Sequence, residues 1–373
     1  MDHTAPASIS AWELMEPIGQ PIARHEAAFV EMGGKFYLLG GRRMNPVSVY
    51  DPVTNAWKNG SVPPVEIHHF QPVIYGDRIV MVGVMTGPFP NETAVDRVLE
   101  YYPQTDRWTW GHAIPEERRR GGAGAVLADN GKIYVVGGIV NGHVGGYVNW
   151  MDEYDPVTGE WRVLPDAPHQ RDHFQAVALD GKIYAVGGRH TSGETGQYFE
   201  LVIPEMDIFD RATQSWSVAK EPLPTPRAGC FAMAHRRDVI VLGGESIVHV
   251  RAHDEVEAFD TINENWRALS PMQIGRHGSG AFIFDNYIYT CSRCAFRGGW
   301  PEMTHMERIA RAVRISRTQS PLRHGAGAQA MITVSTTPTA TATHALGVLR
   351  AKSNSPLAAS RSSRNSGCRL PRN

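Results

Sequence analysis

The stretch RDHFQAVALDGKIYAVGGRH, residues 171–190, decides the fold. It joins two β-prone apolar segments through an Asp-Gly turn and ends in a diglycine, a pattern typical of a β-hairpin. Three further copies stand at 24–41, 120–138 and 227–244, and two weaker copies at 68–83 and 276–293. The first glycine of each doublet therefore marks a repeat: Gly40, Gly83, Gly137, Gly187 and Gly243, with Ser292 in the sixth place.

A second motif follows each of the first five marks. It consists of an aromatic residue, a turn-forming cluster and a tryptophan, and the turn again predicts a hairpin. The five copies are YDPVTNAW at 50–57, YYPQTDRW at 101–108, YDPVTGEW at 154–161, FDRATQSW at 209–216 and FDTINENW at 259–266. Each repeat thus supplies four antiparallel strands, which we call a, b, c and d in chain order.

A four-stranded unit of about 50 residues with a diglycine and a spaced aromatic pair resembles the kelch repeat of the galactose oxidase-like kelch superfamily. The resemblance covers residues 8–310. It implies a β-propeller, in which the blades stand around a central channel. In such a fold the diglycines would end strand b where backbones approach closely, and the tryptophans would pack between blades.

The repeats predict six blades, of which the sixth combines strands from the two ends of the repeat region. Residues 277–310 provide strands a, b and c of a last blade, but no tryptophan hairpin follows them. Residues 8–18, which include Trp12, align with a strand d and would close the ring, which removes an open sheet edge. The prediction is an all-β, six-bladed propeller closed by an N-terminal strand, with blades that start near residues 24, 67, 120, 171, 227 and 276.

The segment 311–373 differs in composition from the repeats. It contains no Asp or Glu and ten Lys or Arg residues, and it is rich in Ser, Thr and Ala. Such a composition cannot bury a core, so we expect a disordered tail.

Charge and composition limit the partners. Lys plus Arg number 37 against 38 for Asp plus Glu, so net charge predicts no attraction to nucleic acid or membranes. The N-terminus has no secretory pattern, and the four scattered cysteines do not form a disulfide framework. We therefore expect a cytoplasmic monomer.

A ring of cations is predicted at one mouth of the channel. The b–c and d–a connections leave the same face of a blade, so the residue that opens strand a lies there. A guanidinium matches a carboxylate or phosphate, which favours an acidic ligand. An equally open alternative is that these arginines tie the d–a loop to a neighbouring blade through backbone carbonyls. The predicted ligand-binding residues are Arg24, Arg120, Arg171, Arg227, Arg276, His68, His69 and His173.

The loops and the fourth blade add further candidates. The long b–c loops carry Tyr147, Trp150, Tyr198 and Trp300, which suit stacking on a sugar or a peptide. Asp172 and His173 are the candidate catalytic pair, because the other blades do not repeat them. Imidazole ligates zinc or copper, but the histidines show no metal-binding spacing, and we expect neither a metal nor a cofactor.

Three functions are compatible with these features. The first is a binding module whose channel face captures an acidic peptide, a protein or an anionic small ligand. The alternative is an enzyme on anionic carbohydrate that resembles the sugar-acid mutarotases and epimerases of the superfamily, in which a carboxylate or His moves a proton. A copper oxidase similar to galactose oxidase ranks third, because its ligand set of tyrosine, histidine and a crosslinked cysteine is not recovered here.

Overall fold

The structure is a computed structural model that describes residues 11–310. The predicted tail 311–373 and the first residues of the predicted N-terminal strand lie outside the described residues. Within 11–310, no helix is long and apolar enough to cross a membrane.

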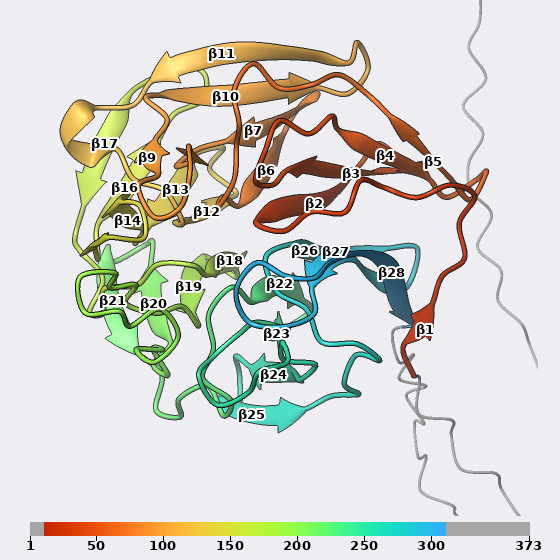
Figure 1. The fold of residues 1–373 in the computed structure, drawn as a ribbon. Coiled ribbons are helices and arrows are strands. Elements are labelled where there is room, and N and C mark those ends of the chain that lie inside the picture. The colour runs from red at the N-terminus through yellow and green to blue at the C-terminus, as the bar shows by residue number, and fades with distance from the viewer. Residues whose placement is uncertain (1–10, 311–373) are drawn as a thin grey trace, which may run out of the picture. The chain divides into compact units, whose positions relative to one another are not determined.

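Six four-stranded antiparallel sheets stand around a central axis (Figure 1), which confirms the six-bladed propeller. Blade 1 comprises β2 (Ala27–Met32), β3 (Lys35–Gly40), β4 (Ser48–Asp51) and β5 (Ala56–Asn59). Blade 2 comprises β6 (Pro72–Tyr75), β7 (Arg78–Met81), β10 (Arg97–Tyr102) and β11 (Arg107–Ala113). Blade 3 comprises β12 (Gly124–Leu127), β13 (Ile133–Val136), β16 (Met151–Tyr154) and β17 (Trp161–Leu164). Blade 4 comprises β18 (Gln175–Leu179), β19 (Lys182–Val186), β20 (Asp207–Asp210) and β21 (Ser215–Val218). Blade 5 comprises β22 (Phe231–His235), β23 (Asp238–Leu242), β24 (Val256–Asp260) and β25 (Asn265–Ala268).

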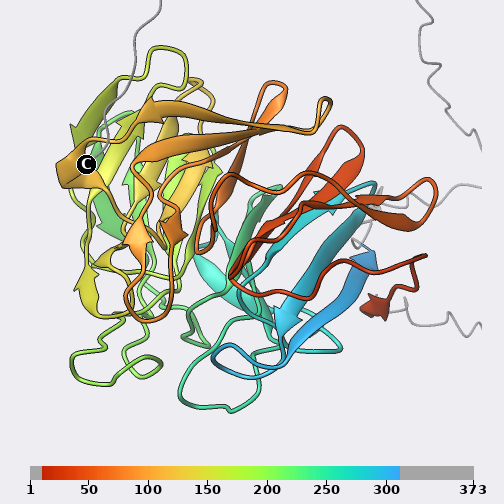
Figure 2. The same cartoon turned by 45° about the horizontal axis from the view of Figure 1, so that its top comes forward.

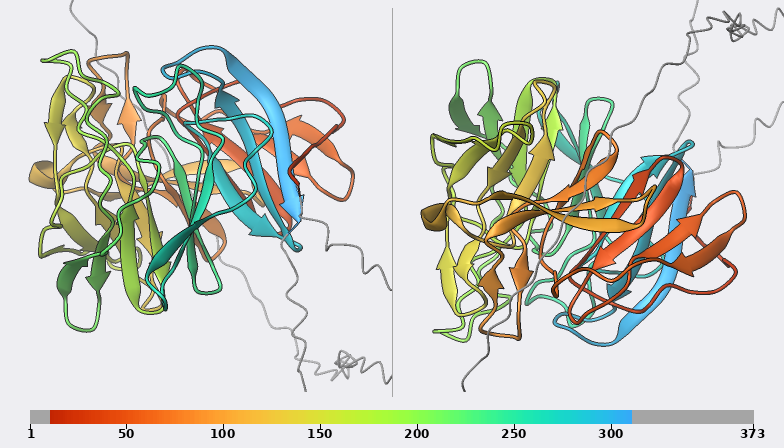
Figure 3. Two further views of the ribbon diagram at one scale, coloured as in Figure 1. Left: turned by 90° about the horizontal axis from the view of Figure 1, so that it is seen from below. Right: turned by 90° about the horizontal axis from the view of Figure 1, so that it is seen from above.

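The sixth blade joins the two ends of the chain. Its order is β1 (Glu13–Leu14), β28 (Glu302–Ala310), β27 (Tyr287–Cys294) and β26 (Gly280–Phe284). Leu14 of β1 pairs with Glu307 of β28. The predicted closure by an N-terminal strand is thereby confirmed, and Figures 2 and 3 show the first and last blades side by side.

Smaller elements decorate the loops of blades 2 and 3. Two short hairpins lie in the b–c connections, and one 3₁₀ turn precedes strand a of blade 3. They are β8 (Met85–Thr86) with β9 (Thr93–Ala94), β14 (Ile139–Asn141) with β15 (Gly145–Tyr147), and η1 (Glu116–Arg118).

The hydrophobic core is divided into six clusters, one at each junction between adjacent blades. At the closing junction, Phe29 and Phe36 of blade 1 pack on Phe282 of blade 6, with both ring-centroid distances 4.8 Å. Each sheet therefore buries both faces against its neighbours, and apolar burial drives the closure of the ring.

The tryptophans of blades 3 to 6 link their blade to the one before it. Trp161 and Trp216 donate their indole N–H to the carbonyls of Ala113 and Pro165 in the preceding blades, at 3.2 and 2.7 Å. Trp12 does the same to Ser270 of blade 5, at 2.9 Å. The prediction that Trp12 is the missing tryptophan of blade 6 is consistent with this contact.

The diglycine ends strand b against the next blade. A Cβ on Gly243, whose φ is +62°, would lie 2.3 Å from the carbonyl oxygen of Arg276. Only glycine fits there without displacing backbone. Blade 6 has Ser292 (φ +59°) in this place, and its hydroxyl donates to the carbonyl of Arg24 at 2.6 Å.

Candidate functional site on the propeller axis

The five predicted arginines lie inside the blades. All five side chains are buried, and four of them donate to the carbonyl of the first diglycine residue of their own blade. In blades 3 to 6 the guanidinium also pairs with a carboxylate of strand c; the pairs are Arg120 with Asp152, Arg171 with Asp207, Arg227 with Glu257 and Arg276 with Glu307. In blade 1, Arg24 donates to Ser48 Oγ at 3.1 Å. These contacts tie strand a to strands b and c.

A closed ring of backbone hydrogen bonds encircles the axis just beyond these arginines. In blades 2 to 6 the residue two places after the arginine position donates its N–H to the equivalent carbonyl of the preceding blade. The bonds run from His69 to Glu26 (3.1 Å), Gly122 to His69 (2.9 Å), His173 to Gly122 (3.0 Å), Gly229 to His173 (2.6 Å) and Gly278 to Gly229 (3.2 Å), and Ala27 closes onto Gly278 (3.0 Å). This ring explains why the six blades share one local backbone geometry.

All six ring residues adopt a positive φ, between 52° and 63°. Glycine, which takes this conformation cheaply, occupies three of the positions. Glu26, His69 and His173 occupy the other three at a backbone cost of about 1–3 kcal/mol each. These three residues therefore place one carboxylate and two imidazoles at the axis, where the glycines of the other three blades have no side chain.

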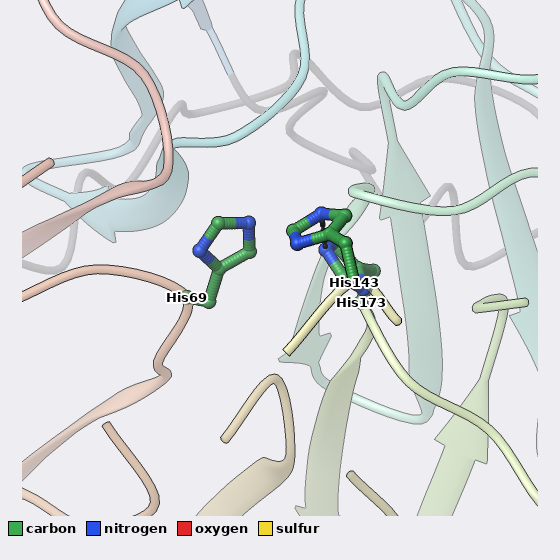
Figure 4. Close-up of side chains that lie close together, drawn as sticks. All are labelled: His69, His143 and His173. Atoms are coloured by element: carbon green, nitrogen blue, oxygen red, sulfur yellow. Dashed lines mark hydrogen bonds between the residues drawn. The ribbon is translucent and has the colours of Figure 1, made fainter. Parts of the chain in front are cut away.

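His69 and His173 meet a third imidazole, His143, which comes from the loop between β14 and β15 (Figure 4). The ring centroids lie 4.7 Å apart for His69 and His173, 4.8 Å for His143 and His173, and 5.1 Å for His69 and His143. Nε2 of His143 faces Nε2 of His173 at 3.1 Å. All three side chains are buried. Three blades thus contribute to one imidazole cluster, which we call the histidine triad.

Carboxylates lie beside the other ring nitrogen of two triad histidines. Nδ1 of His173 contacts Oδ1 of Asp172, and because a carboxylate only accepts, this Nδ1 is the donor and leaves Nε2 as the acceptor. Nδ1 of His143 lies 2.9 Å from Oε1 of Glu92, at ion-pair distance but without hydrogen-bond geometry.

The third ring reaches the same state through His68. Nε2 of His68 lies 3.2 Å from the carbonyl of Gly87, so it donates there, and its Nδ1 must accept. Nδ1 of His69, 2.6 Å away, is then the donor. Nε2 of His69 has no hydrogen-bond partner and lies 3.3 Å from Oε2 of Glu26. It too carries a lone pair.

Burial disfavours the charged form of three of the axial histidines, His68, His69 and His143. Burial, helped by neighbouring Arg42, lowers the pKa of His68 to about 4. Burial and then the adjacent imidazoles hold the pKa of His69 well below its usual range, and burial lowers the pKa of His143 as well. Neutral imidazole is the form that ligates metals.

The carboxylates around the triad are ionised. Burial raises the pKa of Glu26, but His25, His277 and His173 together outweigh it and lower that pKa to about 2. For Asp172, the neighbouring His173 likewise outweighs burial and lowers the pKa. The axis therefore holds buried negative charge.

A second polar network joins the triad to blades 4 to 6. Arg189 donates to Glu245 at 2.5 Å and to the hydroxyl of Thr191 at 3.0 Å, and Thr191 donates to Asp172 at 2.6 Å. His277 places Nε2 3.5 Å from Glu245 and Nδ1 3.8 Å from Glu26. The charged groups of the channel mouth thus form one connected system.

A narrow cavity of about 40 Å³ adjoins the triad on the axis. Its lining includes Glu26, His69, His173 and the three ring glycines. Because one water needs roughly 10–15 Å³, this space suits an ion with one or two waters. It is much smaller than the roughly 300–1,000 Å³ of an ordinary small-molecule pocket.

Comparison with known proteins places these features in a family. The model of the KLHDC2/KLHL20/DRC7 Kelch-repeats domain matches residues 73–292. This chain belongs to that kelch-repeat family.

Individual relatives agree with this membership. The chain is 27% identical over 286 residues to Kelch-like protein terF of Aspergillus terreus, covering 72% of this chain and 60% of that protein. It is 24% identical over 294 residues to human Kelch-like protein 23, covering 77% and 48%. The chain thus spans about three fifths or less of the length of these relatives. The solved structure titled "Structure of YjhT" matches with a TM-score of 0.61 at 14% identity, covering 79% of this chain and 95% of that one, which shows a shared fold.

The predicted loop aromatics of this kelch propeller have different surroundings. Tyr147 stacks on His190 with centroids 4.1 Å apart, and the guanidinium of Arg118 covers Trp150 at 4.5 Å. Tyr198 lies 5.5 Å from Phe89. Trp300 is 75% exposed. Trp300 is therefore the one of the four that is most open to a partner.

Two further groups have metal-ligating side chains. Among residues 11–310, His249, His253 and Glu255 of the blade 5 loop form a second cluster with ligand spacing. Nδ1 of His253 lies 2.9 Å from Glu255, and its Nε2 contacts Ser246 at 2.8 Å. Cys291 and Cys294 are buried, and burial raises the pKa of Cys291 to about 12. Cys291 packs in the core between blades 6 and 1.

The sequence prediction included His68, His69, Asp172 and His173. It aligned Glu26 with His69 and His173 at the channel mouth but did not name it as a site residue, and it did not single out His143 or Glu92. His143 and Glu92 stand in loops that do not repeat, so no alignment of blades could reveal them. Glu26 carries a readable signal. At its aligned position three blades have glycine, and only Glu26, His69 and His173 depart from it.

Proposed function

We propose that this kelch propeller is a binding module that captures a segment of a partner protein on the face formed by its b–c loops. The observation that carries the proposal is a set of exposed apolar side chains on that face, which we call the loop arc. Its members are Phe89, Ile247, Val248, Val250 and Trp300. Val248 is 73% and Val250 65% exposed. Clustered exposed apolar side chains mark interaction surfaces.

Contacts between loops hold the arc together. Phe89 contacts Tyr198, whose neighbour Phe199 accepts a hydrogen bond from the amide of Ile247 at 3.0 Å. The amide of Arg297 donates to the carbonyl of Val250 at 2.9 Å, and its guanidinium donates to the carbonyl of Ile247 at 2.8 Å. Loops of blades 2, 4, 5 and 6 thus contact one another in series and present these side chains from a rigid scaffold.

The charge beside the arc supports a partner segment with acidic flanks. Arg251 follows Val250 and has an exposed side chain. The buried arginines inside the blades have no part in this proposal, because their side chains are inaccessible and bond to groups of their own blades. The partner chemistry we propose is therefore apolar anchor side chains next to Asp or Glu. Location in the cytoplasm stays a prediction.

The sugar-acid alternative has less support. It assigns Arg171 and Arg227 to hold a substrate carboxylate at the channel, but both side chains are fully buried within their blades. The axial cavity of about 40 Å³ is also small for a sugar ring.

A displayed library of random peptides, selected on the full chain, tests the proposal. We expect enriched peptides with apolar and acidic residues. Val248→Ser with Val250→Ser should weaken their binding by about tenfold or more, as should Trp300→Ala.

The matched control is Val53→Ser with Val157→Ser, which removes two valines that are 92% and 71% exposed on the c–d turns of the opposite face. This variant should bind like the wild type. Selection that yields no binder, or peptides that bind the arc variants normally, would refute the proposal.

A further inference from the structure

The histidine triad forms a site that neither the loop arc nor the architecture of the blades requires. In the part of the chain that the structure describes, one ligand nitrogen from each of His69, His143 and His173 lies within 4.8 Å of the others. The three rings come from blades 2, 3 and 4, so the fold brings together residues that are far apart in sequence.

The close approach of the rings favours a shared ligand. Nδ1 of His173 contacts Asp172 and Nδ1 of His69 contacts His68, so the Nε2 atoms of these two rings are left for another partner. Nε2 of His143 and Nε2 of His173 face each other at 3.1 Å. Two ring nitrogens at this distance share a proton or lie beside a metal ion.

The surroundings match those of a metal site. Metal-bound histidines usually give their other ring nitrogen to a carboxylate, as His173 does to Asp172 and as His143 is placed to do to Glu92. Those carboxylates are fixed in turn: Arg42 donates to Glu92 at 2.6 Å, and the amide of Thr191 donates to Asp172 at 2.9 Å. The outer partners therefore orient the rings.

Carboxylates stand beside each ring of the triad. Glu26, Glu92 and Asp172 lie at ion-pair distance from His69, His143 and His173, respectively. Imidazole nitrogens with carboxylate oxygens are the donor set that Zn²⁺ takes in proteins.

We propose that His69, His143 and His173 bind a divalent transition-metal ion of the Zn²⁺ class through their Nε2 atoms. Glu26, with Oε2 3.3 Å from Nε2 of His69, is placed to give a fourth ligand, and the adjoining cavity has room for water. A tetrahedral zinc site spaces its nitrogens about 3.3 Å apart. The His143–His173 pair is near this spacing, and His69 must move inward by up to about 1.5 Å.

A metal ion bound here would join blades 2, 3 and 4 at the mouth of the channel and would fix the loop that carries His143. That loop contacts Phe89 of the loop arc, whose ring centroid lies 5.1 Å from that of His143. Bound metal would therefore order one end of the arc.

Metal titration of the full chain, produced without a histidine tag and stripped with a chelator, tests the proposal. We expect one Zn²⁺ per chain by calorimetry and by elemental analysis. With Co²⁺ as the probe, we expect the visible absorption bands of a four- or five-coordinate nitrogen site. Wild-type protein that binds no Zn²⁺ and shows no such bands would overturn the proposal. The contact between His143 and His173 would then be explained by a shared proton.

Variants then locate the ion. His143→Gln should abolish stoichiometric Zn²⁺ binding, and Asp172→Asn should weaken it by about 10- to 100-fold, because it loses the carboxylate that orients His173. The control His249→Ala removes an exposed histidine of the second cluster and should bind Zn²⁺ like the wild type. Normal binding by His143→Gln, or its loss in His249→Ala, would contradict the assignment. Should His143→Gln not fold, the Co²⁺ spectrum of the wild type still decides.

Discussion

Arg227 and Glu257 form an ion pair inside blade 5, with Nη1 2.6 Å from Oε2 and the arginine side chain fully buried. The arginine opens strand a and the glutamate lies in strand c, so the pair spans strand b. Equivalent pairs occur in blades 3, 4 and 6. The recurring arginine is thus an internal brace of the kelch blade.

Arg227→Met should destabilise the fold by about 3–5 kcal/mol, because it leaves the carboxylate of Glu257 buried without its partner. Denaturant unfolding measures the change. The control Arg251→Met, at an exposed position, should stay within about 0.5 kcal/mol of the wild type. Equal stability of the two variants would contradict the bracing role.

Two glycines with nearly equal φ allow the cost of backbone strain to be measured apart from the cost of a close contact. Gly33→Ala, at φ +61° with open space around it, should cost about 1–2 kcal/mol. Gly243→Ala, at φ +62° with the carbonyl of Arg276 2.3 Å from the new Cβ, should cost at least about 2 kcal/mol more. Thermal and denaturant unfolding of both variants measure the two losses of stability. Similar losses would show that the contact with the next blade does not restrict position 243 to glycine.

Closure of the ring depends on Trp12, which is 3% exposed and belongs to the core between blades 5 and 6. Trp12→Ala should therefore destabilise the propeller by about 3–5 kcal/mol. Trp300→Ala, the same change at an exposed site, should stay within about 0.5 kcal/mol of the wild type in unfolding experiments. A negligible effect of Trp12→Ala would mean that β1 does not close the ring.

The Glu245–Arg189 pair predicts an acid-dependent contribution to stability. Burial raises the pKa of Glu245, but His277 and Arg189 outweigh it, so the folded-state pKa lies below 4.5. A lowered pKa stabilises the fold above the unfolded value, and this stabilisation is lost as pH falls through the folded value.

Glu245→Gln should therefore lower the free energy of unfolding at neutral pH by about 3–5 kcal/mol. The difference from the wild type should shrink as pH falls below about 4.5. Unfolding at a series of pH values between neutral and acidic measures it. A difference that is constant or that grows on acidification would contradict the assigned pKa direction.

The fold was predictable because its determinants repeat. Diglycines, aromatic hairpins and tryptophans recur in register, and a missing strand d in blade 6 together with an unassigned Trp12 pointed to closure between the termini. The sequence could not say how Ser292 replaces a glycine. In the structure its hydroxyl donates to the carbonyl of Arg24, a contact that depends on the closed ring.

The candidate site was predictable only in part, for the opposite reason. The arginine at the position of Arg171 recurs in five of the six blades as a brace, so repetition alone could not separate an architectural role from ligand binding. Asp172 and His173 stood out because they do not recur. His143 lies in a loop of unique sequence, and its approach to His173 depends on how two blades pack, which no local pattern encodes.

The most direct test of the metal centre is anomalous diffraction from crystals of the full chain grown with ZnCl₂, recorded on both sides of the zinc absorption edge. We predict one strong zinc peak bounded by His69, His143 and His173. Ordered imidazoles at these three positions with no zinc peak between them, or a peak found only at His249 and His253, would contradict the assignment.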